Sequence, residues 1–118
     1  MREKLLLVED DADLMEVMTI FLTLRGYKVL KGRNGAEALE IAASQLPDLI
    51  ILDIFLPGMD GFQVASKIRK NPKIRHVPIL AVTGRELSDI RARKAFDGYV
   101  TKPSDLNLLE AKIEELLK

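Results

Sequence analysis

Residues 48–61, with the sequence DLIILDIFLPGMDG, decide the fold of this chain. The segment begins with an unbroken apolar run at residues 49–52, which is typical of a parallel strand covered by helices on both faces. The run stops at the carboxylate of Asp53, and the turn pair Pro57-Gly58 prevents the strand from continuing. In an open α/β sheet, ligands bind beyond the carboxyl ends of the strands. Asp53 is therefore either a turn residue or part of a site.

Four further segments, at residues 5–8, 27–30, 78–82 and 98–101, have the short apolar character of strands. Segments with helical spacing follow each strand, so strand and helix alternate five times along the chain. This alternation predicts an α/β fold with a parallel sheet and right-handed crossovers. At this length the usual solution is a single doubly wound (βα)5 flavodoxin-like domain, with a five-stranded sheet in the order 2-1-3-4-5.

The expected helices carry start and stop signals. Asn34 with Glu37, and Asp60 with Gln63, are typical of capping boxes, and Ser104 is the expected cap of the last helix. Gly26 is the expected stop of the first helix. The apolar residues at helical spacing in that helix are Leu14, Val17, Met18, Phe21 and Leu24.

Composition narrows the possible functions. The chain of 118 residues carries 18 basic and 18 acidic side chains, so its formal net charge is zero. The overall charge therefore does not favour nucleic acid or an anionic membrane as a partner. The absence of cysteine excludes disulfides, thiolate catalysis and cysteine metal sites. The apolar run at residues 5–8 is too short for a signal sequence or a membrane span. We expect one soluble cytoplasmic domain over residues 1–118.

Polar side chains follow four of the five expected strands. Glu9 and Asp10 come after the first, Asp53 after the third, Thr83 after the fourth and Lys102 after the fifth. Because the carboxyl ends of parallel strands meet at one edge, we expect these side chains to converge. Two carboxylates about 4 Å apart repel by about 4 kcal/mol at an effective dielectric of 20. With oxygen ligands and no cysteine, Mg²⁺ is the expected cation.

Thr83 and Lys102 do not suit a pure metal site, because one donates a hydrogen bond and the other is itself a cation. Both suit an anion with several oxygens, such as a phosphoryl group held beside the metal. Gly84 leaves room next to Thr83 for such a group.

Four motifs in order resemble one family over essentially the whole chain. Val8-Glu9-Asp10-Asp11, Leu52-Asp53 with the LPGMDG of residues 56–61, Val82-Thr83-Gly84 and the YVTKP of residues 99–103 closely resemble the CheY-like receiver domain of two-component response regulators. Any one of these motifs alone is weak, whereas four with suitable spacing are very specific.

The resemblance implies a phosphorylation-activated switch in a phosphorelay. Asp53 would accept a phosphoryl group from a sensor histidine kinase or histidine phosphotransfer protein. Glu9, Asp10, Asp53 and the backbone carbonyl of Phe55 would hold Mg²⁺. Thr83 would hydrogen-bond the phosphoryl group, and Lys102 would form an ion pair with it.

The resemblance also implies how the signal leaves the domain. Tyr99 would turn inward as Thr83 moves, and the Lys102–Pro103 peptide bond would be cis, an isomer that proline makes accessible. The changed surface would address an effector domain or protein target, without direct contact to nucleic acid or membrane. The domain would assist its own phosphorylation and dephosphorylation without being a free-standing enzyme.

Three alternatives from other classes fit less well. An aspartyl-phosphate phosphatase of the haloacid-dehalogenase type needs a second Asp two residues after the first, where this chain has Phe55. A nucleotide-binding flavodoxin-like protein needs a glycine loop after the first strand, where Glu9-Asp10-Asp11 would repel phosphate. A receiver-like binding module that works without phosphorylation usually lacks an acid, the Thr or the Lys, and this chain has all of them. This module remains the alternative.

The chain also departs from the family pattern. The stretch from Thr83 to Lys102 is shorter than usual by roughly three to four residues, about one helical turn, so we expect a shortened fourth helix at residues 88–95. Phe55 and Arg85 occupy positions that modulate water access in the family, so we expect an altered acyl-phosphate lifetime. Unchanged dephosphorylation in Phe55→Asn and Arg85→Ala would contradict this.

Several acidic and basic residues have ordinary structural interpretations. Asp11, Asp13 and Asp60 are expected to be helix caps or dipole partners rather than ligands. His76 is expected to be a solvated loop residue.

Overall fold

The computed structural model describes residues 2–84, 94–101 and 105–118. One five-stranded sheet runs through it, with all strands parallel and in the predicted order β2-β1-β3-β4-β5. The strands are β1 (Lys4–Val8), β2 (Lys28–Gly32), β3 (Leu49–Asp53), β4 (Ile79–Thr83) and β5 (Gly98–Thr101). The predicted flavodoxin-like α/β fold is confirmed.

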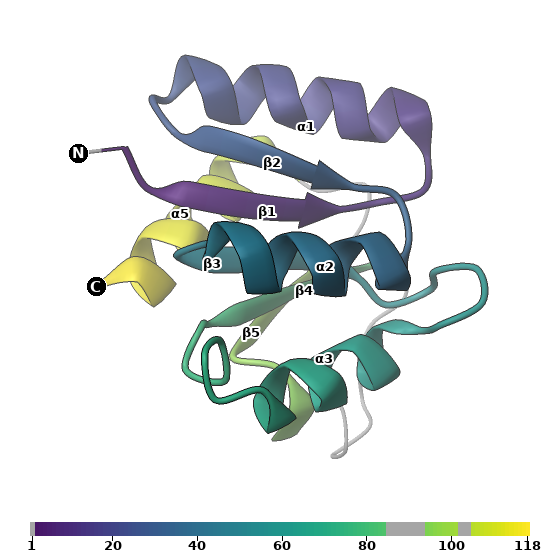
Figure 1. Cartoon of the computed structure of the whole chain (residues 1–118). Coiled ribbons are helices and arrows are strands. Elements are labelled where there is room, and N and C mark those ends of the chain that lie inside the picture. Colours follow the sequence, from purple (N-terminus) through teal and green to yellow (C-terminus); the bar gives the residue numbers. More distant parts are fainter. Residues whose placement is uncertain (1, 85–93, 102–104) are drawn as a thin grey trace.

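Helices cover both faces of the sheet (Figure 1). The described helices are α1 (Ala12–Leu24), α2 (Gly35–Gln45), α3 (Gly61–Lys70) and α5 (Leu106–Leu117). The label α4 is reserved for the helix expected at residues 88–95. This segment lies mostly outside the described residues, so its predicted shortening stays a prediction. No helix in the described ranges is long and apolar enough to cross a membrane.

Strand alternation explains the unbroken apolar runs. In β1, Leu6 and Val8 pack with α2 and α3, whereas Leu5 and Leu7 pack with α1 and α5. Successive side chains point to opposite faces of a strand, so a strand covered on both sides needs an apolar residue at every position. All five residues of β3 are buried for this reason.

The predicted caps at the starts of α1 and α3 are confirmed. Asp11 Oδ1 accepts hydrogen bonds from the backbone N–H groups of Asp13 and Leu14, at 3.0 and 3.2 Å. Asp60 and Gln63 form both arms of a capping box at 2.9 Å each.

The predicted Asn34–Glu37 box is only half formed. Asn34 Oδ1 accepts from the Glu37 N–H at 2.9 Å, but Glu37 Oε1 accepts from the N–H of Arg33, at 3.0 Å.

The apolar residues at helical spacing in α1 are only partly the buried ones. The buried residues of this helix are Met15, Met18 and Leu22, whereas Val17 is 51% and Leu24 79% exposed. The helix has apolar residues on more than one side, so spacing alone allows two stripes, and docking against the sheet and α5 selects the one with Met15.

Two element ends also differ from the prediction. The cap of α5 is Asp105, whose Oδ1 accepts from the Asn107 N–H at 2.8 Å, so the helix begins one residue later than a Ser104 cap requires. Ser104 itself lies outside the described residues. β2 begins at Lys28 rather than Tyr27 and extends to Gly32.

Opposite charges meet at the amino ends of the strands, here called the amino edge. Arg69 Nη2 lies 2.6 Å from Asp97 Oδ2, which also accepts from the Ile79 N–H at 2.7 Å. Arg69 Nη1 donates to the carbonyl oxygens of Arg75 and Val77, at 2.8 and 2.7 Å. This Arg69–Asp97 clasp joins the end of α3 to the starts of β4 and β5.

Candidate functional site

The carboxyl ends of the strands form the opposite edge, here called the carboxyl edge. Val8 is in register with Leu52, and Asp53 with Val82. The residues that follow β1 therefore lie beside the last residue of β3, which in turn lies beside the end of β4. Parallel pairing thus brings Glu9, Asp10 and Asp53 together, as the sequence predicts.

The three acids converge closely enough to hold one ion. A carboxylate oxygen of each of Glu9, Asp10 and Asp53 lies within 4.8 Å of the others. Glu9 and Asp53 are only 2% and 5% exposed, whereas Asp10 is exposed. At this separation each pair of charges repels by about 3 kcal/mol at an effective dielectric of 20. A set of three hard oxygen donors suits a divalent cation such as Mg²⁺, which relieves that repulsion.

Backbone hydrogen bonds orient the two buried carboxylates. Glu9 Oε2 accepts from the Asp11 N–H at 3.1 Å, and the Glu9 N–H donates to the Gly32 carbonyl at 3.1 Å. Asp53 Oδ1 accepts from the Phe55 N–H at 3.0 Å. Each acid is therefore held by the chain that directly follows its own strand, which fixes the side chain before any ligand arrives.

Gly61 is a supporting residue that the sequence interpretation missed. Its N–H donates to the Ile54 carbonyl at 2.8 Å and closes the loop after Asp53. A Cβ atom at this position would lie 2.7 Å from Ile54 Cα and 3.2 Å from the Asp53 carbonyl oxygen. Only glycine allows this approach. The available signal was a glycine directly after the helix cap Asp60.

Thr83 and Tyr99 belong to neighbouring strands. Thr83 is fully buried at the end of β4, and Tyr99 is partly buried against the core on the α2 and α3 side. Tyr99 is in register with Ala81, and Thr83 with Thr101. Because alternate residues share a face, Thr83 and Tyr99 lie on the same face of the sheet, two positions apart.

Some of the residues predicted at or near the site lie outside the described part of the chain. Lys102 and the Lys102–Pro103 peptide bond lie outside the described residues, as does Arg85. The Phe55 side chain is 56% exposed beside Asp53. The role of its backbone carbonyl and the altered acyl-phosphate lifetime stay predictions. His76 is exposed in the loop before β4, as expected.

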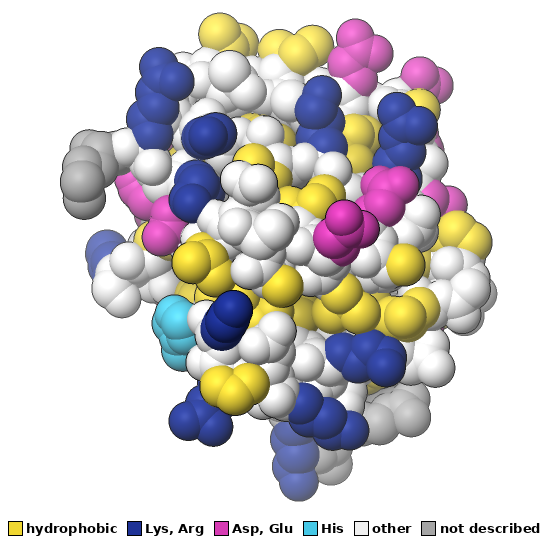
Figure 2. All heavy atoms as spheres, viewed as in Figure 1, with side chains coloured by type: hydrophobic (Ala, Val, Ile, Leu, Met, Phe, Trp, Pro, Cys, Tyr) yellow, Lys and Arg dark blue, Asp and Glu magenta, His cyan; other side chains and the backbone are white. Residues whose placement is uncertain are grey.

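The surface carries both signs of charge. On the face shown in Figure 2, acidic and basic side chains are interspersed above a band of apolar ones, and the charged side chains coloured below the band are basic.

Comparison with known proteins gives one consistent family. Residues 5–114 match the response regulator receiver domain. The transcriptional regulatory protein AfsQ1 of Streptomyces coelicolor is 36% identical over 118 residues, which cover 97% of this chain and 51% of that protein. The response regulator PleD of Caulobacter vibrioides is 34% identical, over 100% of this chain and 27% of that protein. The chain thus spans about half the length of these relatives or less.

A solved structure extends the likeness to the fold. The response regulator TrrA of Thermotoga maritima, in complex with Mg(2+)-BeF, is 35% identical with a TM-score of 0.89, covering 98% of this chain and 99% of that one. Fold, sequence and the converging acids agree, and the chain belongs to the response regulator receiver domain family of two-component signalling.

Proposed function

We propose that the chain, over residues 1–118, is one receiver domain that accepts a phosphoryl group on Asp53 from a sensor histidine kinase or a histidine phosphotransfer protein. The observation that carries the proposal is the carboxylate of Asp53, which is buried at the end of β3 within 4.8 Å of Glu9 and Asp10. A carboxylate fixed by the Phe55 N–H at 3.0 Å is a positioned nucleophile.

In the transfer, a carboxylate oxygen of Asp53 forms a bond to phosphorus. The bond from phosphorus to the imidazole nitrogen of the donor breaks, and its electron pair stays on the imidazole. Glu9, Asp10 and Asp53 would hold Mg²⁺, with the Phe55 carbonyl as an expected further ligand. Mg²⁺ bound there supplies charge neutralisation for the oxygens of the group in transfer. Lys102 would form an ion pair with these oxygens.

The product changes the charge at the carboxyl edge. An aspartyl phosphate carries more negative charge than the carboxylate and adds acceptor oxygens, so it attracts the hydroxyl of Thr83. Thr83 is buried, and its displacement would leave space on the face that Tyr99 shares. Inward movement of Tyr99 would then alter the surface offered to an effector domain or protein target.

Intact mass tests this proposal. The parent, Asp53→Asn and Asp48→Asn are each incubated with Mg²⁺ and a small phosphodonor. Asp48 precedes β3 at the amino edge, where it accepts the Lys4 N–H at 2.7 Å, so it is a matched acid far from the cluster. We expect one phosphoryl adduct in the parent and in Asp48→Asn, dependent on Mg²⁺, and none in Asp53→Asn.

Two other outcomes would contradict the proposal. An adduct that persists in Asp53→Asn would place the acceptor on another residue. A parent that binds Mg²⁺ but gains no mass, from a small donor or from a phosphorylated histidine kinase, would favour the phosphorylation-independent binding module.

A further inference from the structure

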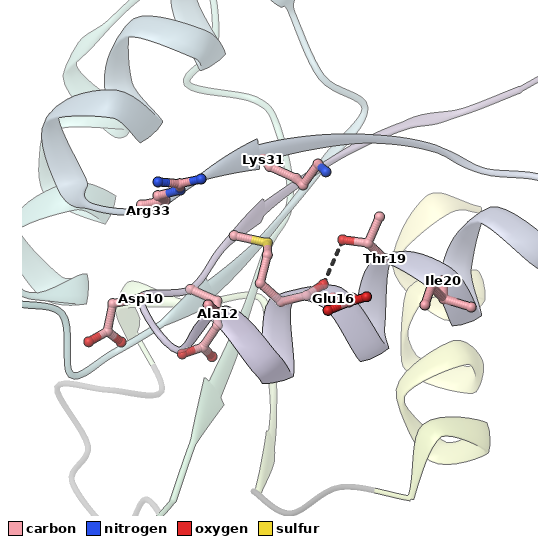
Figure 3. Close-up of a pocket in the computed structure, with 9 residues that line it drawn as sticks. Asp10, Ala12, Glu16, Thr19, Ile20, Lys31 and Arg33 are labelled. Atoms are coloured by element: carbon pink, nitrogen blue, oxygen red, sulfur yellow. Dashed lines mark hydrogen bonds between the residues drawn. The ribbon is translucent and has the colours of Figure 1, made fainter.

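A groove beside the carboxylate cluster carries cations that the proposed function does not use. The groove has a volume of about 700 Å³ and runs between α1 and β2, and Glu9 and Asp10 line one end of it. Lys31 and Arg33 reach it from β2 and the residue after it, opposite Glu16 on α1 (Figure 3). Two of the three clustered acids and the two cations therefore line one groove.

The sheet register places these cations close to the acids. Lys31 pairs with Leu7, and the Glu9 N–H bonds the Gly32 carbonyl at 3.1 Å. Arg33 therefore lies beside the chain that carries Glu9. β2 neighbours β1, and β1 neighbours β3, so two strand spacings of about 5 Å put the backbone of Arg33 about 10 Å from that of Asp53. Lys31 lies two residues further from the carboxyl edge.

The same alternation sets the face that Lys31 occupies. Leu7 packs on the α1 side of the sheet, so Lys31, its partner in register, lies on that side as well. Both cations are exposed, and neither makes an ion pair within 4 Å in the described part of the chain. Their charge is therefore available to a solute that enters the groove.

We propose that Lys31 and Arg33 guide small dianionic phosphodonors, of the acyl phosphate or phosphoramidate class, past the acids to Asp53. The proposal rests on the proposed function and adds two positioning residues to it. Three carboxylates repel a phosphate dianion, and two cations on the adjacent strand reduce that barrier along one approach. Such an effect acts on the rate of encounter and weakens with salt.

Lys31 and Arg33 should weaken Mg²⁺ binding, whereas they should speed the arrival of an anionic donor. A doubly positive ion and a doubly negative donor feel the same field with reversed sign, so removing Lys31 and Arg33 should slow phosphorylation and tighten Mg²⁺ binding. A side chain with only a structural role would not move these two quantities in opposite directions.

The test compares the parent, Lys31→Ala, Arg33→Ala, the double variant and Lys28→Ala. Lys28 is exposed at the amino end of β2, so its loss removes the same charge away from the groove. Phosphorylation by acetyl phosphate is followed by intact mass at saturating Mg²⁺, and Mg²⁺ affinity by calorimetry. At ~0.01 M salt we expect each single variant to react about threefold more slowly, and the double variant about five- to tenfold.

The expected pattern has three further parts. The rate difference falls below about twofold at 1 M salt, where the Debye length is ~3 Å. The dissociation constant for Mg²⁺ falls severalfold in the double variant at low salt. Lys31→Arg and Arg33→Lys, which keep the charge, react like the parent.

Each contrary result is distinct. Equal rates in parent and double variant, or an equal loss in Lys28→Ala, overturn the guiding role and leave Asp53 phosphorylation standing. A slower rate with unchanged Mg²⁺ affinity and no salt dependence also overturns it. A parent that gains no phosphoryl group overturns the proposed function and this inference together.

Discussion

The two edges of the sheet treat charge in opposite ways. At the amino edge a carboxylate meets a cation and backbone donors, as in the Arg69–Asp97 clasp. At the carboxyl edge three carboxylates, from Glu9, Asp10 and Asp53, meet one another within 4.8 Å. The first arrangement is stable as it stands, whereas the second has a cost that a bound cation relieves.

Within one sheet, the amino edge contributes to stability, whereas the carboxyl edge carries the candidate site. A local arrangement that opposes stability is retained where a ligand or a reaction needs it. The signs of neighbouring charges at strand ends therefore help to interpret them. Opposite charges in contact indicate a stabilising role, whereas like charges in contact indicate a ligand-binding site.

The largest effect is expected where the loop after Asp53 touches α3. Gly61→Ala puts a methyl group against the backbone of Ile54, which cannot rotate away, so we expect a loss of about 3 kcal/mol in the free energy of unfolding. Urea denaturation measures it. Gly98→Ala is the control, because a Cβ at Gly98 would meet only the terminal Cδ1 atoms of Leu80 and Leu116, at 3.4 and 3.5 Å.

We expect the Gly98→Ala change to alter the free energy of unfolding by less than about 1 kcal/mol. Equal losses in the two variants would mean that the close approach at Ile54 does not constrain the loop.

The second largest effect is expected from removing the Arg69–Asp97 interaction at the amino edge. Asp97→Ala removes the partner of Arg69 and leaves the buried N–H of Ile79 without its side-chain acceptor, so we expect a loss of about 2 kcal/mol. Thermal and urea unfolding provide the measurement. Asp97→Asn keeps an acceptor oxygen and should restore about half of the loss. A stability equal to that of the parent in Asp97→Ala would show that the clasp does not fasten β4 to β5.

The third effect has the opposite sign. Asp10→Asn removes one repelling charge from the carboxyl edge, so without Mg²⁺ it should stabilise the protein by about 1 kcal/mol. Millimolar Mg²⁺ should then raise the unfolding temperature of the parent more than that of the variant.

Asp13→Asn serves as the control for this variant. Asp13 lies in the first turn of α1, where a negative charge favours the helix, so its neutralisation should destabilise slightly. Destabilisation by Asp10→Asn in Mg²⁺-free buffer would contradict the repulsion at the cluster.

The smallest effect concerns Tyr27, just before β2. Burial, followed by the charges of Glu114, Glu3 and Glu110, raises the pKa of its phenol above the usual 10.0. The folded state therefore keeps this proton to higher pH than the unfolded chain does. The stability that results is complete below pH ~10 and is lost as pH rises through the folded pKa.

Urea denaturation between pH 9 and 11.5 tests this effect, with Tyr27→Phe as the comparison. The variant should lose less stability than the parent over that window. Parallel curves would show that the phenol does not titrate differently on folding.

Much of the fold could be predicted because buried parallel strands leave a plain pattern. Every position of β3 is apolar up to Asp53, and the acids that follow β1 and β3 must meet once the strands are parallel neighbours. The acidic cluster could be predicted for the same reason, since residues next to a strand end have little freedom.

The remaining features depend on contacts that the sequence does not display. Arg69 and Asp97 lie 28 positions apart, and neither stands in a recognisable pattern. The close approach of Gly61 to Ile54 depends on the path of a loop. In α1 two apolar stripes compete, and at α5 the adjacent Ser104 and Asp105 are both good caps, so packing or local geometry decides.

The strand order has a consequence for the pairing of the strands. β1 pairs with both β2 and β3, whereas β4 and β5 lie beyond β3. Glu9, Asp10 and Asp53 therefore come together when β1 pairs with β3, within the first half of the chain. Like-charge repulsion therefore opposes the pairing of β1 with β3, so the carboxylates that suit this edge to a divalent cation also weaken a strand pairing inside the sheet.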